Sequence, residues 1–387
     1  MKEGWEYKKL GDIATYINGF PFKPSDWENS GKPIIRIQNL TNPQSTFNRC
    51  SRTDIPKKYF VSYGDILISW SATLGVFEWT LEDALLNQHI FKVVFDKIAI
   101  NKQYFRYAIM TSISEMSKHT NGATMKHIRK GDFDNIRIPS PPLSEQQSIV
   151  DYLDSAFAKI DAMKANAEKA LNEAKALFQA SLKEMLEPKE GWEEKYVGDI
   201  AEIKGGKRLP KGEKLQSEPT NHKYIRVADF NDYGTVDLSD IQYISDKVFE
   251  QIKRYIITKD DIYISIAGTI GKSGIIPDEL DGANLTENAC RLILSNEIYQ
   301  KFMYYITISP EFVRQEIEST KISAQPKLAL TRLAGIIISY PSIIEQQKIA
   351  ETLDSLKSKV DRLQENYNKI SQECDALKQS ILRQVFE

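Results

Sequence analysis

Two stretches of about forty residues, after Ser144 and after Ile344, contain neither proline nor glycine and repeat apolar residues at helical spacing. In the second stretch the apolar positions follow a 4-3 spacing: Ile349, Leu353, Leu356, Val360, Leu363, Tyr367, Ile370, Cys374, Leu377 and Ile381. The first stretch has a weaker version: Leu153, Phe157, Ile160, Ala167, Leu171, Ala174 and Phe178. This spacing predicts two coiled-coil helices, each about 60 Å long at about 1.5 Å per residue.

A helix with a single apolar stripe is stable in water only when that stripe is covered. Since both helices belong to one chain with a folded region between them, we expect them to pack against each other as an antiparallel pair. In the alternative, each helix packs on a different protein.

Shorter apolar runs outside these helices alternate with turn residues and predict β-strands. In the first half they cover residues 33–37, 65–69 and 91–95, and in the second half 224–227, 261–265 and 291–294. Helical stretches follow at about 101–118 and 297–320. Each half therefore predicts an α+β domain.

The two halves are copies of each other. Residues 2–5 (Lys-Glu-Gly-Trp) return at 189–192, and residues 145–147 (Glu-Gln-Gln) return at 345–347. A period near half the chain is too long for a solenoid repeat, so each copy is expected to be a domain. We predict domains at 1–143 and 188–343, separated by coiled-coil helices at 144–187 and 344–387.

Composition narrows the class of protein. The chain has 51 basic and 53 acidic residues, so any site for a polyanion must be a local patch. Three cysteines lie far apart without a paired spacing and suggest neither a disulfide framework nor a zinc site. No apolar run reaches the roughly 18 residues that span a membrane. We expect a cytoplasmic protein with no membrane partner.

The segments that resemble catalytic motifs each lack a residue that the motif requires. Gly271-Lys272-Ser273 resembles the end of a phosphate-binding loop, but Ile266 stands where that motif needs glycine. The motif predicts a tight glycine turn. Lys272 in this turn either contacts a nucleic-acid phosphate or has no role beyond the turn, and the sequence favours neither alternative. Ser140-Pro141-Pro142-Leu143 lacks the aromatic residue with which amino-methyltransferases hold a base, so we expect the prolines to end a strand before the helix. The four histidines, at 89, 119, 127 and 222, have no ligand or triad spacing. We predict neither catalytic nor metal-binding residues.

Two basic, glycine-bearing segments are candidates for binding. Residues 118–130 contain no acid, and residues 204–214 contain five basic residues around Gly205-Gly206 and one acid. Such loops can contact phosphates and base edges, although a solvated run of charge explains either one alone. The copies also diverge most in loops, at 86–89 against 285–288 and at 122–126 against 323–327. This divergence is typical of two readers of different sequences, and also of drift.

With these features, the chain resembles the specificity subunit of type I restriction-modification systems. The residues that carry the resemblance are Gly4-Trp5 with 10–13 (Leu-Gly-Asp-Ile), 64–69, 87–90 and 138–149, nearly all of them repeated in the second copy. The resemblance implies two target-recognition domains, each reading half of a bipartite site in double-stranded DNA. Half-sites on one face of a duplex lie about 34 Å apart, or a multiple of this. The coiled coil would set this gap.

The resemblance also implies partners. The helices would dock methyltransferase subunits, two by expectation, and a restriction and translocase subunit would join through that complex. S-adenosylmethionine, ATP and Mg²⁺ are expected on those partners, and no cofactor in this chain. Alternatives are a scaffold that binds no DNA and joins two protein-interaction domains, and a recognition subunit for a stand-alone methyltransferase.

The resemblance guides the choice of DNA-contacting residues by their positions in the loops. The candidates are Lys118, Asn121, Thr124, Lys126, His127 and Arg129 in the first half, and Lys204, Lys207, Arg208, Lys272, Ser323, Gln325 and Lys327 in the second. The second half departs from the first at 286–288 and at Pro326.

Overall fold

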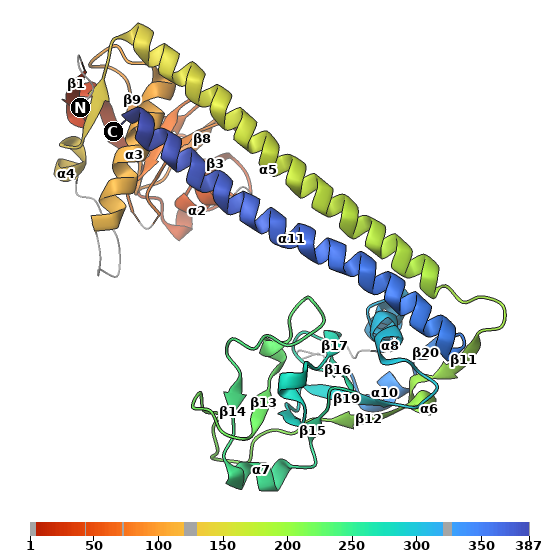
Figure 1. Cartoon of the computed structure of the whole chain (residues 1–387). Helices are drawn as coiled ribbons and strands as arrows, with labels where there is room; N and C mark the ends of the chain where they lie inside the picture. Colours follow the sequence, from red (N-terminus) through yellow and green to blue (C-terminus); the bar gives the residue numbers. More distant parts are fainter. Residues whose placement is uncertain (1–4, 43, 72, 120–129, 320–326, 387) are drawn as a thin grey trace. The chain divides into compact units, whose positions relative to one another are not determined.

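The computed structural model describes residues 5–42, 44–71, 73–119, 130–319 and 327–386, without the side chains of 113–119. The chain forms two compact units (Figure 1). Unit 1 comprises Met1–Asn166 and Lys369–Glu387, and unit 2 comprises Ala167–Asn368. Each unit contains one copy of the sequence repeat and a section of both long helices, α5 (Leu143–Leu186) and α11 (Ile343–Phe386).

Unit 1 contains three small sheets. The first is antiparallel, in the order β2 (Thr15–Asn18), β9 (Ile90–Val94), β6 (Ile66–Ser69) and β7 (Gly75–Glu78). The second, with β3 and β8 parallel, has the order β4 (Asn48–Cys50), β3 (Lys32–Ile35), β8 (Ala84–Leu86) and β5 (Phe60–Val61). The third pairs β1 (Glu6–Lys9) with β10 (Arg137–Ser140). The short helices are α1 (Leu10–Ile13), η1 (Pro24–Asp26), α2 (Ile37–Thr41), η2 (Lys57–Tyr59), α3 (Lys102–His119) and α4 (Lys130–Asp134).

Unit 2 repeats this topology strand for strand. Its sheets are β12 (Ala201–Gly205), β19 (Ala289–Leu294), β16 (Ile262–Ser265) and β17 (Ser273–Ile275); β14 (Gln242–Tyr243), β13 (Lys223–Ile225), β18 (Ala283–Leu285) and β15 (Ile256–Ile257); and β11 (Glu193–Tyr196) with β20 (Ile337–Tyr340). Its helices are α6 (Val197–Ile200), η3 (Val227–Asp229), α7 (Asp246–Ile252), η4 (Asp278–Leu280), α8 (Gln300–Thr307), α9 (Pro310–Ser319) and α10 (Leu330–Ala334). The predicted α+β class and internal repeat are confirmed.

Periodicity alone misplaced one helix. The apolar pattern predicts a single helix over about 297–320, but α8 ends at Thr307 and α9 begins at Pro310. Proline has no backbone N–H and clashes with the preceding turn, so it starts a helix more readily than it continues one. The matching α3 of unit 1 has no proline and is continuous.

The two long helices pair antiparallel within each unit. In unit 1, Asp161 of α5 pairs with Lys378 of α11, and Lys164, one turn further along α5, lies 3.5 Å from Asp375, one turn earlier on α11. In unit 2, Lys175 of α5 donates to Gln364 of α11 at 2.6 Å. The predicted antiparallel coiled coil is therefore confirmed.

Leu377 does not belong to the seam, as the 4-3 spacing predicts, because its side chain is 48% exposed. Lys378 takes that place with its Nζ 5.4 Å from the centre of the Phe157 ring. Because the apolar repeat of α11 shifts by one residue here, Leu382, Val385 and Phe386 lie in the core of unit 1. Phe386 packs there against Tyr104, with 5.6 Å between the ring centres.

A buried glutamine joins each long helix to the domain that precedes it, and we call this contact the glutamine latch. The Gln146 Oε1 accepts from the Asn101 backbone N–H at 2.9 Å, and its Nε2 donates to the Pro141 carbonyl at 2.8 Å. Gln346 does the same in unit 2, accepting from the Tyr299 N–H at 2.8 Å and donating to the carbonyls of Glu297 and Pro341 at 2.9 Å. In both units a tyrosine hydroxyl donates to an aspartate about two turns after the glutamine on the helix: Tyr107 to Asp154, and Tyr305 to Asp354.

Removing the second latch is expected to weaken unit 2. Gln346→Ala leaves one buried N–H and two carbonyls without their partner, so we expect the free energy of unfolding to fall by about 2 kcal/mol. The measurement is urea unfolding of the variant and the parent protein. Gln347→Ala, which removes an exposed neighbour of the same residue type, is the control and is expected to have almost no effect. Equal stability of the two variants would contradict the latch.

Candidate nucleic-acid interface

The sequence-predicted contacts divide into three groups. Asn121, Thr124, Lys126, His127, Arg129, Ser323 and Gln325 lie outside the described residues. Lys118 lies on the last turn of α3, where the backbone alone is described. Lys204, Lys207, Arg208, Lys272 and Lys327 are described, and all belong to unit 2.

The glycine pair of unit 2 lies directly against the loop between β18 and β19. The Gly206 N–H donates to the Ala289 carbonyl at 2.9 Å, and the Lys207 N–H donates to the Leu285 carbonyl at 2.8 Å. A Cβ on residue 206 would lie 2.1 Å from the Thr286 carbonyl oxygen. Glycine is therefore required here so that the two loops can touch.

Two further segments, at residues 266–267 and 327–328, join the loop between β18 and β19. The Ile266 N–H donates to the Asn288 carbonyl at 2.8 Å, and the Leu328 N–H donates to the Ile266 carbonyl at 2.9 Å. A β-bridge between Ala267 and Lys327 places that lysine beside the loop after β16. These contacts bring Lys327 to the loops that carry Lys207 and Arg208.

The joined loops form two hollows, and Gly205-Gly206 lines both of them. The first, of about 580 Å³, is lined by charged side chains of Lys207, Arg208, Glu287, Lys327 and Arg332. The second, of about 490 Å³, is lined by Lys204, Arg254 and Arg291 among others. We call the surface around both hollows the basic edge. It brings together four of the sequence-predicted residues: Lys204, Lys207, Arg208 and Lys327.

Most cations of the basic edge are available to a ligand. Lys204 pairs with Glu202 at 2.9 Å, and Arg208 pairs with Glu287 at 2.5 Å. Arg291 is turned inward, where it pairs with the buried Asp261 at 2.9 Å. Within the described part of the chain, Lys207, Arg254, Lys327 and Arg332 form no ion pair and are exposed. Exposed Lys and Arg around a polar hollow can neutralise phosphates.

Two cations of this surface, Arg254 and Arg332, were missed by sequence reasoning. Each stands outside the basic segments, in the loop after α7 and on α10. No local signal in the sequence marks either one, because both reach the basic edge through the tertiary fold alone.

Lys272 lies apart from the basic edge. Its Nζ is 2.9 Å from the Asp232 carboxylate and 3.2 Å from the Phe230 carbonyl. It lines another hollow of unit 2, together with residues of α5 and α11. Gly271 before it has a φ of 86°, which fits the tight glycine turn that the sequence predicts. A DNA contact by Lys272 stays a prediction.

A buried carboxyl group of α9 lies behind this turn. A Cβ on Gly271 would be 2.5 Å from Oε2 of Glu316, and burial raises the pKa of Glu316 from 4.5 to about 7. The folded chain therefore holds this proton more tightly than the unfolded chain between these two pH values.

We expect the free energy of unfolding of unit 2 to fall as the pH rises from about 4.5 to about 7. The slope is at most about 1.4 kcal/mol per pH unit. Glu316→Gln removes the titrating group and should flatten this part of the profile, whereas Glu318→Gln, on the exposed side of the same helix, should retain it. Urea unfolding at several pH values measures both. A parent profile that rises over this range would contradict the assignment.

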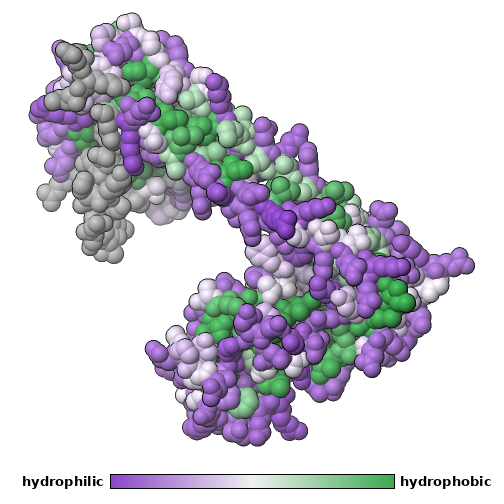
Figure 2. Space-filling view, in the orientation of Figure 1, coloured by the Kyte–Doolittle hydropathy of each residue, from purple (hydrophilic) through white to green (hydrophobic). Residues whose placement is uncertain are grey.

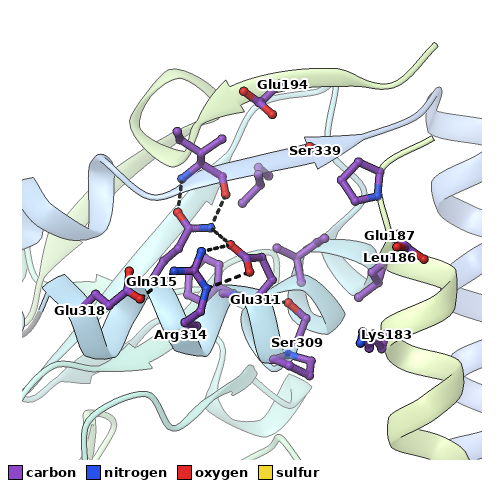
Figure 3. Close-up of a pocket in the computed structure, with 16 residues that line it drawn as sticks. Lys183, Leu186, Glu187, Glu194, Ser309, Glu311, Arg314, Gln315, Glu318 and Ser339 are labelled. Carbon is purple, nitrogen blue, oxygen red and sulfur yellow. Dashed lines mark hydrogen bonds and ion pairs between the residues drawn. The ribbon is translucent and has the colours of Figure 1, made fainter. Parts of the chain in front are cut away.

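A fourth hollow of unit 2, of about 710 Å³, has the opposite charge (Figure 3). Its acids are Glu187, Glu194, Glu311 and Glu318, against Lys183 and Arg314. Arg314 is held between Glu311 at 2.6 Å and Glu318 at 2.7 Å. The Gln315 amide pairs with both backbone groups of Ile337, at 2.9 Å each. Excess negative charge makes this hollow unsuitable for a nucleic acid.

Unit 1 builds the equivalent loop contact with different side chains. The Gly19 N–H donates to the Ile90 carbonyl at 3.1 Å, the Phe20 N–H donates to the Leu86 carbonyl at 2.8 Å, and a Cβ on Gly19 would lie 2.0 Å from the Asn87 carbonyl oxygen. The framework is thus the same as at Gly206, but Phe20 replaces Lys207.

An aromatic group stands next to this contact in unit 1. Trp70 stacks on Phe91 with 5.6 Å between ring centres and lies 5.1 Å from the His89 ring. His89 has a φ of 71°, a left-handed conformation that non-glycine residues seldom adopt outside functional sites and tight turns. Sequence reasoning found no ligand or triad spacing for His89 and overlooked Trp70.

The described residues contain no cluster of three potential metal ligands among His, Cys, Asp and Glu. None of the helices in the described ranges is both long and apolar enough to cross a membrane.

Comparison with known proteins agrees with the internal repeat. Residues 2–173 and 189–372 both match the type I restriction modification DNA specificity domain. The chain belongs to this family. It is therefore a DNA-recognition subunit of a type I restriction-modification system, with partners among DNA and the other subunits of such a system. This membership argues against a scaffold that binds no DNA.

Individual relatives match along the whole chain. The specificity subunit of the type I restriction enzyme EcoBI from Escherichia coli is 27% identical over 100% of this chain and 86% of its own length. The MjaVIII specificity subunit from Methanocaldococcus jannaschii is 25% identical over 99% of this chain and 92% of its own length. A solved chain of a type I R-M system has the same fold, with a TM-score of 0.77 at 15% identity, covering 100% of this chain and 98% of that one. Specificity subunits of this kind are non-catalytic targeting subunits.

Proposed function

We propose that each unit binds one half of a bipartite site in double-stranded DNA, and that unit 2 does so through the basic edge. The observation that carries the proposal is the contact at Gly19 and at Gly206. In both units the glycine and the residue after it donate the same two backbone hydrogen bonds, to the strand residues on either side of the 87–89 or the 286–288 loop. The side chains that this common framework presents differ between the two copies. Phe20 of unit 1 corresponds to Lys207 of unit 2, and residues 87–89 correspond to residues 286–288.

Phosphate contacts and base-edge contacts have different roles in the recognition of DNA. Phosphate contacts position a protein on the duplex without reading its sequence, whereas base-edge contacts carry the specificity. Lys207, Arg254, Lys327 and Arg332, which form no ion pair with any described residue, suit the first task. The loop at 286–288, whose Glu287 lines one hollow together with Lys207, Lys327 and Arg332, suits the second. In unit 1 we propose the same roles for the predicted residues of 118–129 and for the 87–89 loop.

The long helices are proposed to dock methyltransferase subunits, two by expectation, and to set the gap between half-sites. Apolar side chains are exposed along both helices, as Figure 2 shows for one face. They include Tyr152 and Met163 in unit 1 and Leu177 and Ile344 in unit 2. Side chains of this kind form partner surfaces when they line up along a helix. A restriction and translocase subunit would join through the methyltransferases.

In this proposal the chain itself carries no cofactor. S-adenosylmethionine would bind to the methyltransferase subunits, and ATP and Mg²⁺ to the translocase subunit. The complex would act in the cytoplasm, where the host DNA is.

The test is to purify the chain with its methyltransferase subunit and to map methylated adenines in host DNA by single-molecule sequencing. The proposal expects a split motif with a fixed gap, which disappears when the gene for this chain is deleted. Unchanged methylation after deletion, together with no stable complex, would contradict it.

A further inference from the structure

An acid lies within the basic edge. Of the described residues that line the 580 Å³ hollow, four are basic and Glu287 is the one carboxylate. It lies in the loop between β18 and β19, next to the Gly206 contact. A carboxylate beside bound DNA repels the phosphates, so its presence there calls for a favourable contact with another part of the duplex.

The side chain of Glu287 is held in a fixed position. Its Oε1 accepts from Nε of Arg208 at 2.5 Å, and its Oε2 accepts from the Thr286 hydroxyl at 3.1 Å. The side chain is 25% exposed, while that of Arg208 is 77% exposed. Partial burial by itself raises the pKa of Glu287, but the hydrogen bonds from Arg208, its own backbone and Thr286 outweigh this and lower it. The group is therefore an oriented anion.

This anion can accept further hydrogen bonds. An ionised carboxylate has about four acceptor positions, and the contacts with Arg208, Thr286 and its own backbone leave at least one of them for a further donor. The donors that a duplex offers at its base edges are exocyclic amino groups. In the major groove these are N4 of cytosine and N6 of adenine, and Glu pairs best with the amino group of cytosine.

Unit 1 has a different residue at the same point of the framework. Gln88 lies between β8 and β9 as Glu287 lies between β18 and β19, and its backbone N–H donates to the Phe20 carbonyl at 3.0 Å. In the described part of the chain the Gln88 amide makes no side-chain hydrogen bond and is half-buried. An amide offers a donor and an acceptor, which match adenine, whereas a carboxylate only accepts.

We propose that Glu287 is a specificity-determining residue of unit 2, which accepts a hydrogen bond from the exocyclic amino group of one base, a cytosine by best match, in the half-site of that unit. Gln88 occupies the equivalent reading position in unit 1. This inference rests on the proposed function, because it presumes that the basic edge binds DNA. It adds which residue reads a base and what chemical group that residue reads.

The experiment compares the parent protein with Glu287→Gln, both in complex with the methyltransferase subunit. DNA fragments are selected by binding from a library randomised across both half-sites. Glu287→Gln keeps the size of the side chain but adds a donor and removes the charge. We expect the preference at one base pair of one half-site to change at least about tenfold, while the other half-site keeps its preferences.

Glu311→Gln is the matched control, since Glu311 pairs with Arg314 at 2.6 Å, as Glu287 pairs with Arg208, but lines the acidic hollow. It should leave every preference unchanged. The reciprocal variant Gln88→Glu should alter one base pair of the opposite half-site, which keeps the test valid if Glu287→Gln fails to fold.

The outcomes separate the two proposals. If the parent complex selects no sequence, the proposed function fails. If the parent selects a split site and Glu287→Gln selects the same site with lower affinity for all sequences, Glu287 merely positions Arg208 and this inference is overturned. An unchanged affinity and unchanged preference would overturn it as well.

Discussion

Replacing Lys207, Lys327 and Arg332 together by alanine is expected to weaken DNA binding by at least about 100-fold at ~0.1 M salt. Each of these side chains is exposed at the basic edge and has no ion-pair partner among the described residues. Each lost phosphate contact reduces the slope of log affinity against log salt by about 0.9, so the triple variant should lower the slope by about 3. Titration of a duplex at several salt concentrations measures both quantities.

The control for this variant is Lys183→Ala. Lys183 is an exposed lysine of the same unit, but it lines the acidic hollow (Figure 3). It should change neither the affinity nor the slope. If the triple variant and Lys183→Ala bind DNA equally well at every salt concentration, the basic edge is not the DNA-binding surface of unit 2.

Leu382→Ala is expected to lower the free energy of unfolding of unit 1 by about 3–5 kcal/mol, the range for removing a buried leucine without repacking. Leu382 is 2% exposed and lies in the core of unit 1 with Val385 and Phe386. The cavity would separate α11 from the domain that it covers. Urea unfolding followed by hydrogen exchange at buried amides of α3 measures the loss where it occurs.

Leu377→Ala is the matched control, since it makes the same change one turn earlier on the same helix at an exposed position. We expect an effect below about 0.5 kcal/mol. Should Leu377→Ala prove the more damaging variant, the 4-3 spacing of the sequence would describe the seam better than the structure does.

The large elements were predictable because their signals are periodic. A coiled-coil seam repeats over many turns, and local exceptions such as Leu377 do not hide it. The repeat of the Glu-Gln-Gln motif marked the first turn of both helices, and the α+β class followed from short apolar runs. The break before Pro310 has a local signal in the sequence, the proline itself, which a periodic apolar pattern does not register.

The basic edge was predictable only in part. Lys204, Lys207 and Arg208 are neighbours in the sequence, and their charge was a local signal. That Lys327 joins them depends on a bridge to Ala267, and no spacing rule connects residues so far apart. Arg254 and Arg332 are single charges in ordinary segments. Glu287 was visible only as a difference between the two copies, and its partner Arg208 became evident in the structure alone.

The glutamine latch has a consequence for how new specificities could arise. The hydrogen bonds of Gln146 and Gln346 go only to backbone atoms of the preceding domain, which every residue type supplies. Beside the latch, the joint requires one domain side chain in each unit, the tyrosine that donates to Asp154 or Asp354. A domain of foreign sequence that keeps the backbone path and this tyrosine would therefore retain these contacts with the helix, so that one recognition domain can be exchanged for another.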